Sequence, residues 1–96
     1  MEKLDEQQIA TALEHLNGWN LQSGFIVKSF RFGDFKEAFA FMTRVAFEAE
    51  AQQHHPNWEN VYNSITVRLN THDADGITTK DIKLAKTIDQ IVKNIT

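Results

Sequence analysis

The sequence contains no cysteine, and this absence removes several classes of chemistry at once. Disulfide-stabilised scaffolds, thiolate nucleophiles, iron–sulfur clusters and cysteine-ligated zinc sites all need a thiol that this chain does not have. Proline occurs once and glycine four times, and no Pro/Gly-rich linker, repeat or low-complexity tract interrupts the chain. Because 96 residues is the usual length of one domain, we expect residues 1–96 to form a single domain.

The chain also lacks an excess of basic residues and a long apolar run. Its formal net charge of −3 argues against a nucleic-acid binder, because such proteins carry a basic patch. No apolar run approaches the roughly 18 residues of a membrane span, and residues 1–6 do not resemble a signal peptide. No glycine-rich phosphate loop or serine elbow is present. We therefore expect a cytoplasmic protein that binds neither nucleic acid nor membrane.

Three segments have the apolar spacing and the start signals of helices. Asp5, Asp34 and Thr78 stand at the expected N-cap positions, and each is followed three residues later by a glutamine or an acidic residue. The spacing predicts helices over residues 6–16, 35–53 and 79–94. Pro56 disfavours helical geometry at the residue before it, so the second helix should end near residues 53–54.

Strand-like segments lie between the predicted helices. They cover residues 19–21, 25–32, 58–62 and 65–69. In the last of them, Ile65, Val67 and Leu69 alternate with polar residues, which is typical of a half-buried strand. A tight turn is expected at residues 63–64. The order α-β-β-α-β-β-α, with two hairpins, predicts an α+β domain in which helices cover one face of an antiparallel sheet.

Four histidines are the main candidates for acid–base chemistry near neutral pH. His54 and His55 precede Pro56 at the exit of the second helix, where the proline fixes the backbone. His72 follows the last strand, and His15 lies on the first helix, where a surface position is expected. Taken alone, the adjacent pair could simply interact with the negative end of a helix dipole, and His72 could be an exposed loop residue.

Two acidic residues stand at useful positions near these histidines. Glu50 lies four residues before His54, so Glu50 could orient His54 or form a surface pair of about 0.3–0.5 kcal/mol. Asp81 is expected to cap the third helix, and a helix N-terminus beside a site adds an electrostatic role. Glu50, His54 and His72 could also form a two-histidine, one-carboxylate metal triad. No metal-ligand spacing is present, so we expect no metal.

The segment from residue 50 to residue 81 resembles the signature of the pterin-4a-carbinolamine dehydratases, also called 4a-hydroxytetrahydrobiopterin dehydratases. That signature is an acidic residue, three residues of any kind, His-His-Pro, an aromatic residue, a distant histidine and an aspartate. In this chain it reads Glu50, His54, His55, Pro56, Tyr62, His72 and Asp81. The flanking residues 41–46, 58–63 and 81–85 agree, and the resemblance extends over nearly the whole chain. Gln53 stands where the family often has an aspartate.

The resemblance implies a fold, an assembly and an activity. The fold is a four-stranded antiparallel sheet with three helices packed on one face, and members form homo-dimers or homo-tetramers. The activity is the removal of water from 4a-hydroxytetrahydropterin to give quinonoid dihydropterin, which recycles the cofactor of aromatic amino acid hydroxylases. This elimination needs a proton acceptor and a proton donor, but no metal or redox cofactor. The alternative is non-catalytic, because the family also includes a dimerisation cofactor of a homeodomain transcription factor.

The resemblance also assigns roles to individual residues. The expected catalytic residues are Glu50, His54, His55 and His72. The expected pterin-binding residues are His54, His55, Pro56, Trp58, Asn70, Thr71, His72 and Asp73, with Asp81 in support. We expect His54 and His72 to be the acid–base pair, with Glu50 orienting His54. His55 would position the pterin, whose amide-like edge would meet the polar groups that flank His72.

Overall fold

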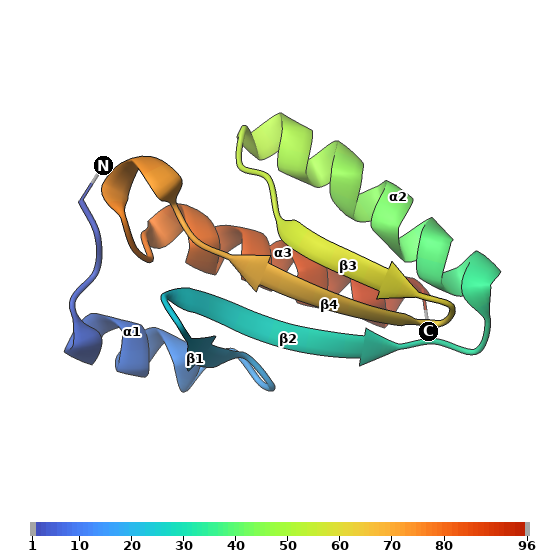
Figure 1. The fold of residues 1–96 in the computed structure, drawn as a ribbon, viewed down its shortest axis with the longest axis horizontal. Coiled ribbons are helices and arrows are strands. Elements are labelled where there is room, and N and C mark those ends of the chain that lie inside the picture. Colours follow the sequence, from blue (N-terminus) through green and yellow to red (C-terminus); the bar gives the residue numbers. More distant parts are fainter. Residues whose placement is uncertain (1, 96) are drawn as a thin grey trace.

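The computed structural model describes residues 2–95, in which three α-helices pack against an antiparallel sheet (Figure 1). The helices are α1 (Glu6–Leu13), α2 (Phe35–Gln52) and α3 (Thr79–Ile95). The strands are β1 (Asn20–Gln22), β2 (Phe25–Arg31), β3 (Asn57–Val61) and β4 (Ser64–Leu69). This order confirms the predicted α+β architecture and the arrangement α-β-β-α-β-β-α. Within the described residues, none of the helices combines the length and the apolar character needed to cross a bilayer.

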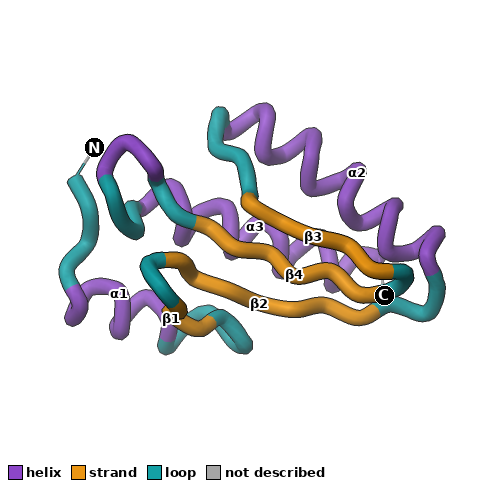
Figure 2. The backbone as a smooth tube through the Cα atoms, viewed as in Figure 1, coloured by secondary structure: helices purple, strands orange, loops and turns teal. Residues whose placement is uncertain are grey.

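All neighbouring strands pair antiparallel, in the spatial order β1-β2-β4-β3 (Figure 2). The two central strands come from different hairpins, and their register sets Ile26 opposite Leu69 and Phe30 opposite Ile65. Alternate residues of a strand share a face, so this register gathers the apolar side chains of both strands on one side of the sheet. The segment that follows Leu69 therefore leaves the sheet beside the start of β2.

The core lies on the face of the sheet that the helices cover. Phe41 of α2 is fully buried, and its ring centroid lies 5.0 Å from those of both Phe30 and Phe32. All three helices contribute to the same cluster, with Ile9 from α1, Ala38, Phe41, Val45 and Ala49 from α2, and Leu84, Ala85, Ile88 and Ile91 from α3. The opposite face carries polar contacts such as the one between the hydroxyls of Ser29 and Thr66, 3.2 Å apart. The prediction of three helices on one face is confirmed.

The end of α1 differs from the prediction, because the helix stops at Leu13 rather than at residue 16. The chain continues in two tight turns, in which His15 N donates to Ala12 O and Leu16 N donates to Leu13 O, each at 3.1 Å. These turns still bury Leu16. Leu16 therefore packs in the core, as the apolar spacing predicts, but tight turns rather than an α-helix place it there.

Two turns near the sheet also differ from the prediction. The β3–β4 turn consists of residues 62–63 instead of 63–64, and Tyr62 adopts a positive φ of 52°. Beyond β4, a short 3₁₀ helix, η1 (His72–Ala74), forms where periodicity predicts no element, and Asp75 follows it with a φ of 54°. Thr71 N donates to Gly76 O at 2.8 Å, which closes this segment into a compact loop. The loop holds His72 beside the end of α2.

Candidate active site

The C-terminal end of α2 determines where the two adjacent histidines lie. Gln53 closes the helix in the left-handed conformation, with φ 53° and ψ 42°, and His54 N donates to Ala49 O at 3.0 Å. A left-handed cap reverses the chain direction, and Pro56 then keeps the following segment extended. As a result the neighbours have opposite environments, since His54 is buried at 8% exposure and His55 is exposed.

The buried His54 ring contacts the carboxylate of Asp81 in the first turn of α3. His54 Nε2 and Asp81 Oδ1 are 2.5 Å apart, and Asp81 is fully buried. A carboxylate can only accept hydrogen bonds, so Nε2 of His54 donates, and in the neutral form of the ring Nδ1 carries the lone pair. The contact therefore fixes both the orientation and the tautomer of the ring, and leaves Nδ1 available for chemistry.

The other oxygen of Asp81 connects this contact to the start of α3 and to the end of β4. Asp81 Oδ2 accepts from Thr78 N and from Thr71 Oγ1, each at 2.8 Å. Because Thr71 Oγ1 donates its proton to Asp81, it accepts from Thr78 Oγ1 at 2.7 Å. Thr78 Oγ1 in turn accepts from Lys80 N at 3.2 Å. This satisfied network holds the carboxylate rigidly. The predicted capping role of Asp81 is confirmed, and the same side chain also holds His54.

Glu50 has a different partner from the predicted one. Its Oε1 accepts from His55 Nε2 at 2.8 Å, and the two side chains are 82% and 65% exposed, respectively. The predicted contact between Glu50 and His54 is therefore wrong. A contact between positions i and i+4 requires the helix to continue through residue 54, whereas the left-handed Gln53 turns His54 away from the helix axis and toward α3.

One cavity of about 280 Å³ brings the three signature histidines together. It is lined by Gln53, His54, His55, Asn70, Thr71, His72, Asp73 and Lys80. His54 comes from the exit of α2 and His72 from the loop after β4, so the cavity joins two segments that lie apart in the sequence. Sequence reasoning missed Lys80, although its place between the cap Thr78 and the carboxylate Asp81 puts it in the turn that borders the site.

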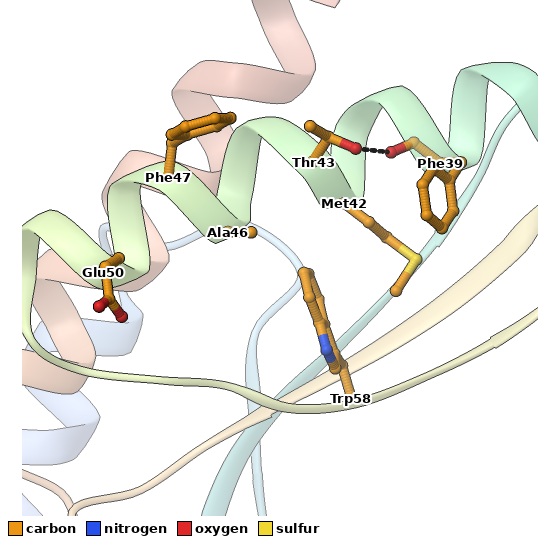
Figure 3. A pocket seen from close by; sticks show the side chains of 7 residues that line it. All are labelled: Phe39, Met42, Thr43, Ala46, Phe47, Glu50 and Trp58. Carbon is orange, nitrogen blue, oxygen red and sulfur yellow. Dashed lines mark hydrogen bonds between the residues drawn. The ribbon is translucent and has the colours of Figure 1, made fainter.

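Four of the predicted site residues lie outside the lining of this cavity, and one of them is Asp81, the hydrogen-bond partner of His54. Pro56 is half-buried and does not line it. Trp58 and Glu50 instead line a second, apolar groove of about 410 Å³, in which the Trp58 indole extends from β3 toward Met42 and Ala46 of α2 (Figure 3). Contacts of Pro56 and Trp58 with a pterin stay a prediction.

The metal triad considered above is not assembled. Glu50 lies against the exposed His55, while His54 lies against Asp81. Across residues 2–95, no group of three or more histidine, aspartate and glutamate side chains is placed to hold a metal ion.

Comparison with known proteins gives concordant results in sequence and in structure. A family model described as pterin 4 alpha carbinolamine dehydratase matches residues 2–91. A relative from Christiangramia forsetii, provisionally named pterin-4-alpha-carbinolamine dehydratase, is 55% identical over 94 residues. The alignment covers 98% of this chain and 97% of the relative. A relative from Burkholderia pseudomallei with the same provisional name is 51% identical over 94 residues, covering 96% of this chain and 93% of its own.

Two solved structures share the fold. The crystal structure of a transcriptional coactivator/pterin dehydratase from Brucella melitensis has a TM-score of 0.92 and 41% identity, covering 94% of this chain and 98% of that one. A pterin dehydratase-like protein described as a RuBisCO assembly factor in the α-carboxysome has a TM-score of 0.68 and 21% identity, covering 80% and 92%. The second likeness supports the fold alone. Since the family model spans nearly the whole chain and the relatives match at more than half of the aligned positions, this chain belongs to the pterin-4-alpha-carbinolamine dehydratase family.

Proposed function

We propose that this chain is a 4a-hydroxytetrahydrobiopterin dehydratase, which removes water from a 4a-hydroxytetrahydropterin to give quinonoid dihydropterin and so recycles the cofactor of aromatic amino acid hydroxylases. The observation that carries the proposal is the convergence of His54, His55 and His72 on one cavity, with His54 held by a buried carboxylate. The cavity volume of about 280 Å³ is close to the lower end of the range for small-molecule sites, which suits the bicyclic head of a pterin.

The reaction requires two proton transfers, and two imidazoles can perform them. A base takes the proton from N5 of the pterin, and the N5 electron pair forms the C4a=N5 double bond as the C4a–O bond breaks. An acid protonates the departing hydroxide, which leaves as water. We assign these transfers to His54, through its Nδ1, and to His72, and each transfer contributes roughly 10²–10⁴-fold to the rate. Asp81 then acts as the positioning residue for His54, and Glu50 as that for His55.

The polar groups beside His72 divide into those that build the site and those free to meet a ligand. The Thr71 hydroxyl donates to Asp81, and its backbone N–H donates to Gly76 O, so Thr71 supports the site from within. The side chains of Asn70 and Asp73 also line the cavity and have no hydrogen bond within residues 2–95. We assign the contacts with the amide-like edge of the pterin to Asn70 and Asp73.

The test is the spectroscopic rate of dehydration of a synthetic 4a-hydroxytetrahydropterin. Wild-type protein should exceed the uncatalysed rate, and His72→Ala should lower the catalysed rate by about 10²–10⁴-fold. Arg31→Ala is the control, because Arg31 is exposed at the opposite end of the sheet, and should leave the rate unchanged. A wild-type rate equal to the uncatalysed one would refute the enzyme, and full activity in His72→Ala would refute the role of His72.

The same family implies a homo-dimer or homo-tetramer, and we assign its contact surface to α2. Phe39 and Phe47 border the apolar groove of Figure 3 and are 54% and 72% exposed. Large exposed apolar patches mark interaction sites. If two copies of α2 pair antiparallel about Thr43, Phe39 of one lies level with Phe47 of the other, and Lys36 lies level with Glu50. This self-complementary order of aromatic and opposite charges favours a second copy of the chain as the occupant.

A further inference from the structure

A second polar cavity lies between the end of α1 and the exposed side of α3. Its volume is about 560 Å³, larger than that of the histidine cavity. It is lined by His15, Leu16, Asn17, Lys28, Lys86, Asp89, Gln90, Val92 and Lys93. None of these residues lines the histidine cavity, and the proposed dehydration uses none of them.

The floor of this cavity contains a lysine at a position where the sheet would bury an apolar residue. Lys28 stands between Ile26 and Phe30 by alternation along β2, on the face that the helices cover. Its Nζ donates to Asp89 Oδ1 at 2.9 Å and to Asn17 O at 2.8 Å. The ammonium also lies 5.1 Å from the centroid of the Phe30 ring. The half-buried ammonium group of Lys28 is therefore stabilised by a carboxylate, a backbone carbonyl and an aromatic ring.

The acidic residue of the cavity lining already has partners for its charge. Both oxygens of Asp89 accept from Trp19 Nε1 at 3.1 Å, and Oδ1 also accepts from Lys28. The side chains of Lys28 and Asp89 are 22% and 23% exposed, so water screens this pair only in part. Asp89 therefore has little capacity left to neutralise further cations in the cavity.

Two more lysines line the cavity without any such partner. Lys86 and Lys93 lie seven residues apart on α3, on the same face as Asp89 and Gln90, because i, i+3, i+4 and i+7 coincide on a helix. Within residues 2–95, neither ammonium group makes a hydrogen bond or ion pair, and neither does the imidazole of His15. A cavity with uncompensated positive charge thus occurs in a chain whose formal net charge is −3.

We propose that this cavity binds a small organic anion of the phosphate-monoester type. Lys86 and Lys93 would receive the phosphate, and the ester group would lie against the apolar side chains of Leu16 and Val92. Two free ammonium groups match a phosphate monoester, which is close to a dianion at neutral pH, better than a carboxylate with one charge. The volume of about 560 Å³ is within the range of small-molecule sites. This site is independent of the proposed dehydratase reaction.

The test is isothermal titration calorimetry with phenyl phosphate. Wild-type protein should bind it saturably, and the double variant Lys86→Gln/Lys93→Gln should weaken binding about tenfold or more, because it removes two charge-assisted contacts. The double variant Lys3→Gln/Lys83→Gln removes the same charge from exposed lysines outside the cavity, and should change affinity less than about twofold. The absence of saturable binding, or an equal loss in both double variants, would overturn the proposal.

Three further probes test the chemistry of the ligand and the place where it binds. Inorganic phosphate, benzoate and benzyl alcohol should each bind more weakly than phenyl phosphate, and equal affinity for any of them would contradict the assigned class. Backbone amide shifts on adding phenyl phosphate should concentrate at residues 15–17 and 86–93, and shifts confined to the histidine cavity would overturn the site. Because no pterin is present, the outcome is separate from that of the dehydration assay.

Discussion

At the scale of single residues, the candidate site contains two carboxylates with very different surroundings, each the partner of one histidine. Asp81 is fully buried and accepts hydrogen bonds from His54, Thr71 and Thr78. The side chain of Glu50 is 82% exposed, and its partner among the three signature histidines is His55. A hydrogen bond to a charged group contributes about 1.5–3 kcal/mol, whereas an exposed ion pair contributes about 0–1 kcal/mol. His54 is therefore held far more firmly than His55.

We predict that Asp81→Asn lowers kcat for dehydration by about 10–100-fold. The amide has one acceptor oxygen where the carboxylate has two, so it cannot serve all three donors, and the tautomer of His54 is no longer fixed. The KM for the pterin should change less, because Asp81 does not line the cavity. Steady-state kinetics of the purified variant measure both constants.

Glu50→Gln is the matched control, since it removes the same charge from the partner of the other histidine. We expect it to lower kcat by less than about fivefold, because an exposed pair contributes little. Circular dichroism of both variants checks that α3, which Asp81 caps, is still formed. Equal losses in the two variants would show that Asp81 has no special role in positioning His54.

At the scale of secondary-structure elements, the end of α2 decides how the site is built. The left-handed Gln53 sends His54 toward α3 and leaves His55 beside Glu50. A residue with a Cβ adopts this conformation at a cost of about 1–2 kcal/mol relative to the right-handed one, whereas glycine adopts it freely. The chain therefore contains some backbone strain at the residue that separates the two histidines.

We predict that Gln53→Gly raises the free energy of unfolding by about 0.5–1 kcal/mol, because it relieves this strain. The matched control is Ala51→Gly, two residues earlier in the last turn of α2, which should lower the free energy of unfolding by about 0.5–1 kcal/mol. Urea denaturation at a fixed protein concentration measures both. A destabilising effect of Gln53→Gly would show that the Gln53 side chain, not its backbone conformation, determines the stability of this turn.

At the scale of the whole molecule, three surface features occupy different places. The histidine cavity lies between the end of α2 and the loop after β4. The second polar cavity, which Lys86 and Lys93 line, lies between the end of α1 and α3. The apolar groove runs between α2 and β3 and is lined in part by Glu50 (Figure 3). Glu50 also accepts a hydrogen bond from His55, so the groove adjoins the candidate active site. A second copy of the chain on the proposed α2 surface would therefore lie next to the candidate active site, although no residue that lines the groove also lines the histidine cavity.

We predict that Phe47→Glu converts the proposed homo-oligomer to monomers at micromolar concentration, because it places two carboxylates in the proposed apolar contact between copies of α2. Gln7→Glu on exposed α1 is the control, with the same change in charge, and should leave the assembly intact. Sedimentation velocity measures the mass of each. An unchanged mass for Phe47→Glu would contradict the assignment of the surface.

The same variants separate the enzymatic function from the non-catalytic alternative. Phe47→Glu should retain the dehydration rate within about threefold, because Phe47 does not line the histidine cavity. His72→Ala should retain the assembly and lose the rate. The reverse pattern would favour an interaction protein in which the histidines have no catalytic part.

The sequence by itself determined the elements and most of the site's members. Asp5 and Asp34 cap helices where predicted, and apolar alternation located β4 within one residue, because caps and periodicity act over a few neighbouring residues. Six of the predicted residues line one cavity, since the signature places His54, His55 and the segment around His72 at element ends. These features depend on the spacing of residues along the chain, so a single sequence is enough to predict them.

Only the tertiary structure decided which groups meet. The partner of His54 is Asp81, 27 residues away, because the left-handed Gln53 overrides the helical spacing that would pair His54 with Glu50. Lys28 likewise finds Asp89 across the gap between a strand and a helix, 61 residues away. Burial, charge compensation and cavities arise from the packing of segments that are distant in the sequence. The spacing of neighbouring residues therefore does not predict them.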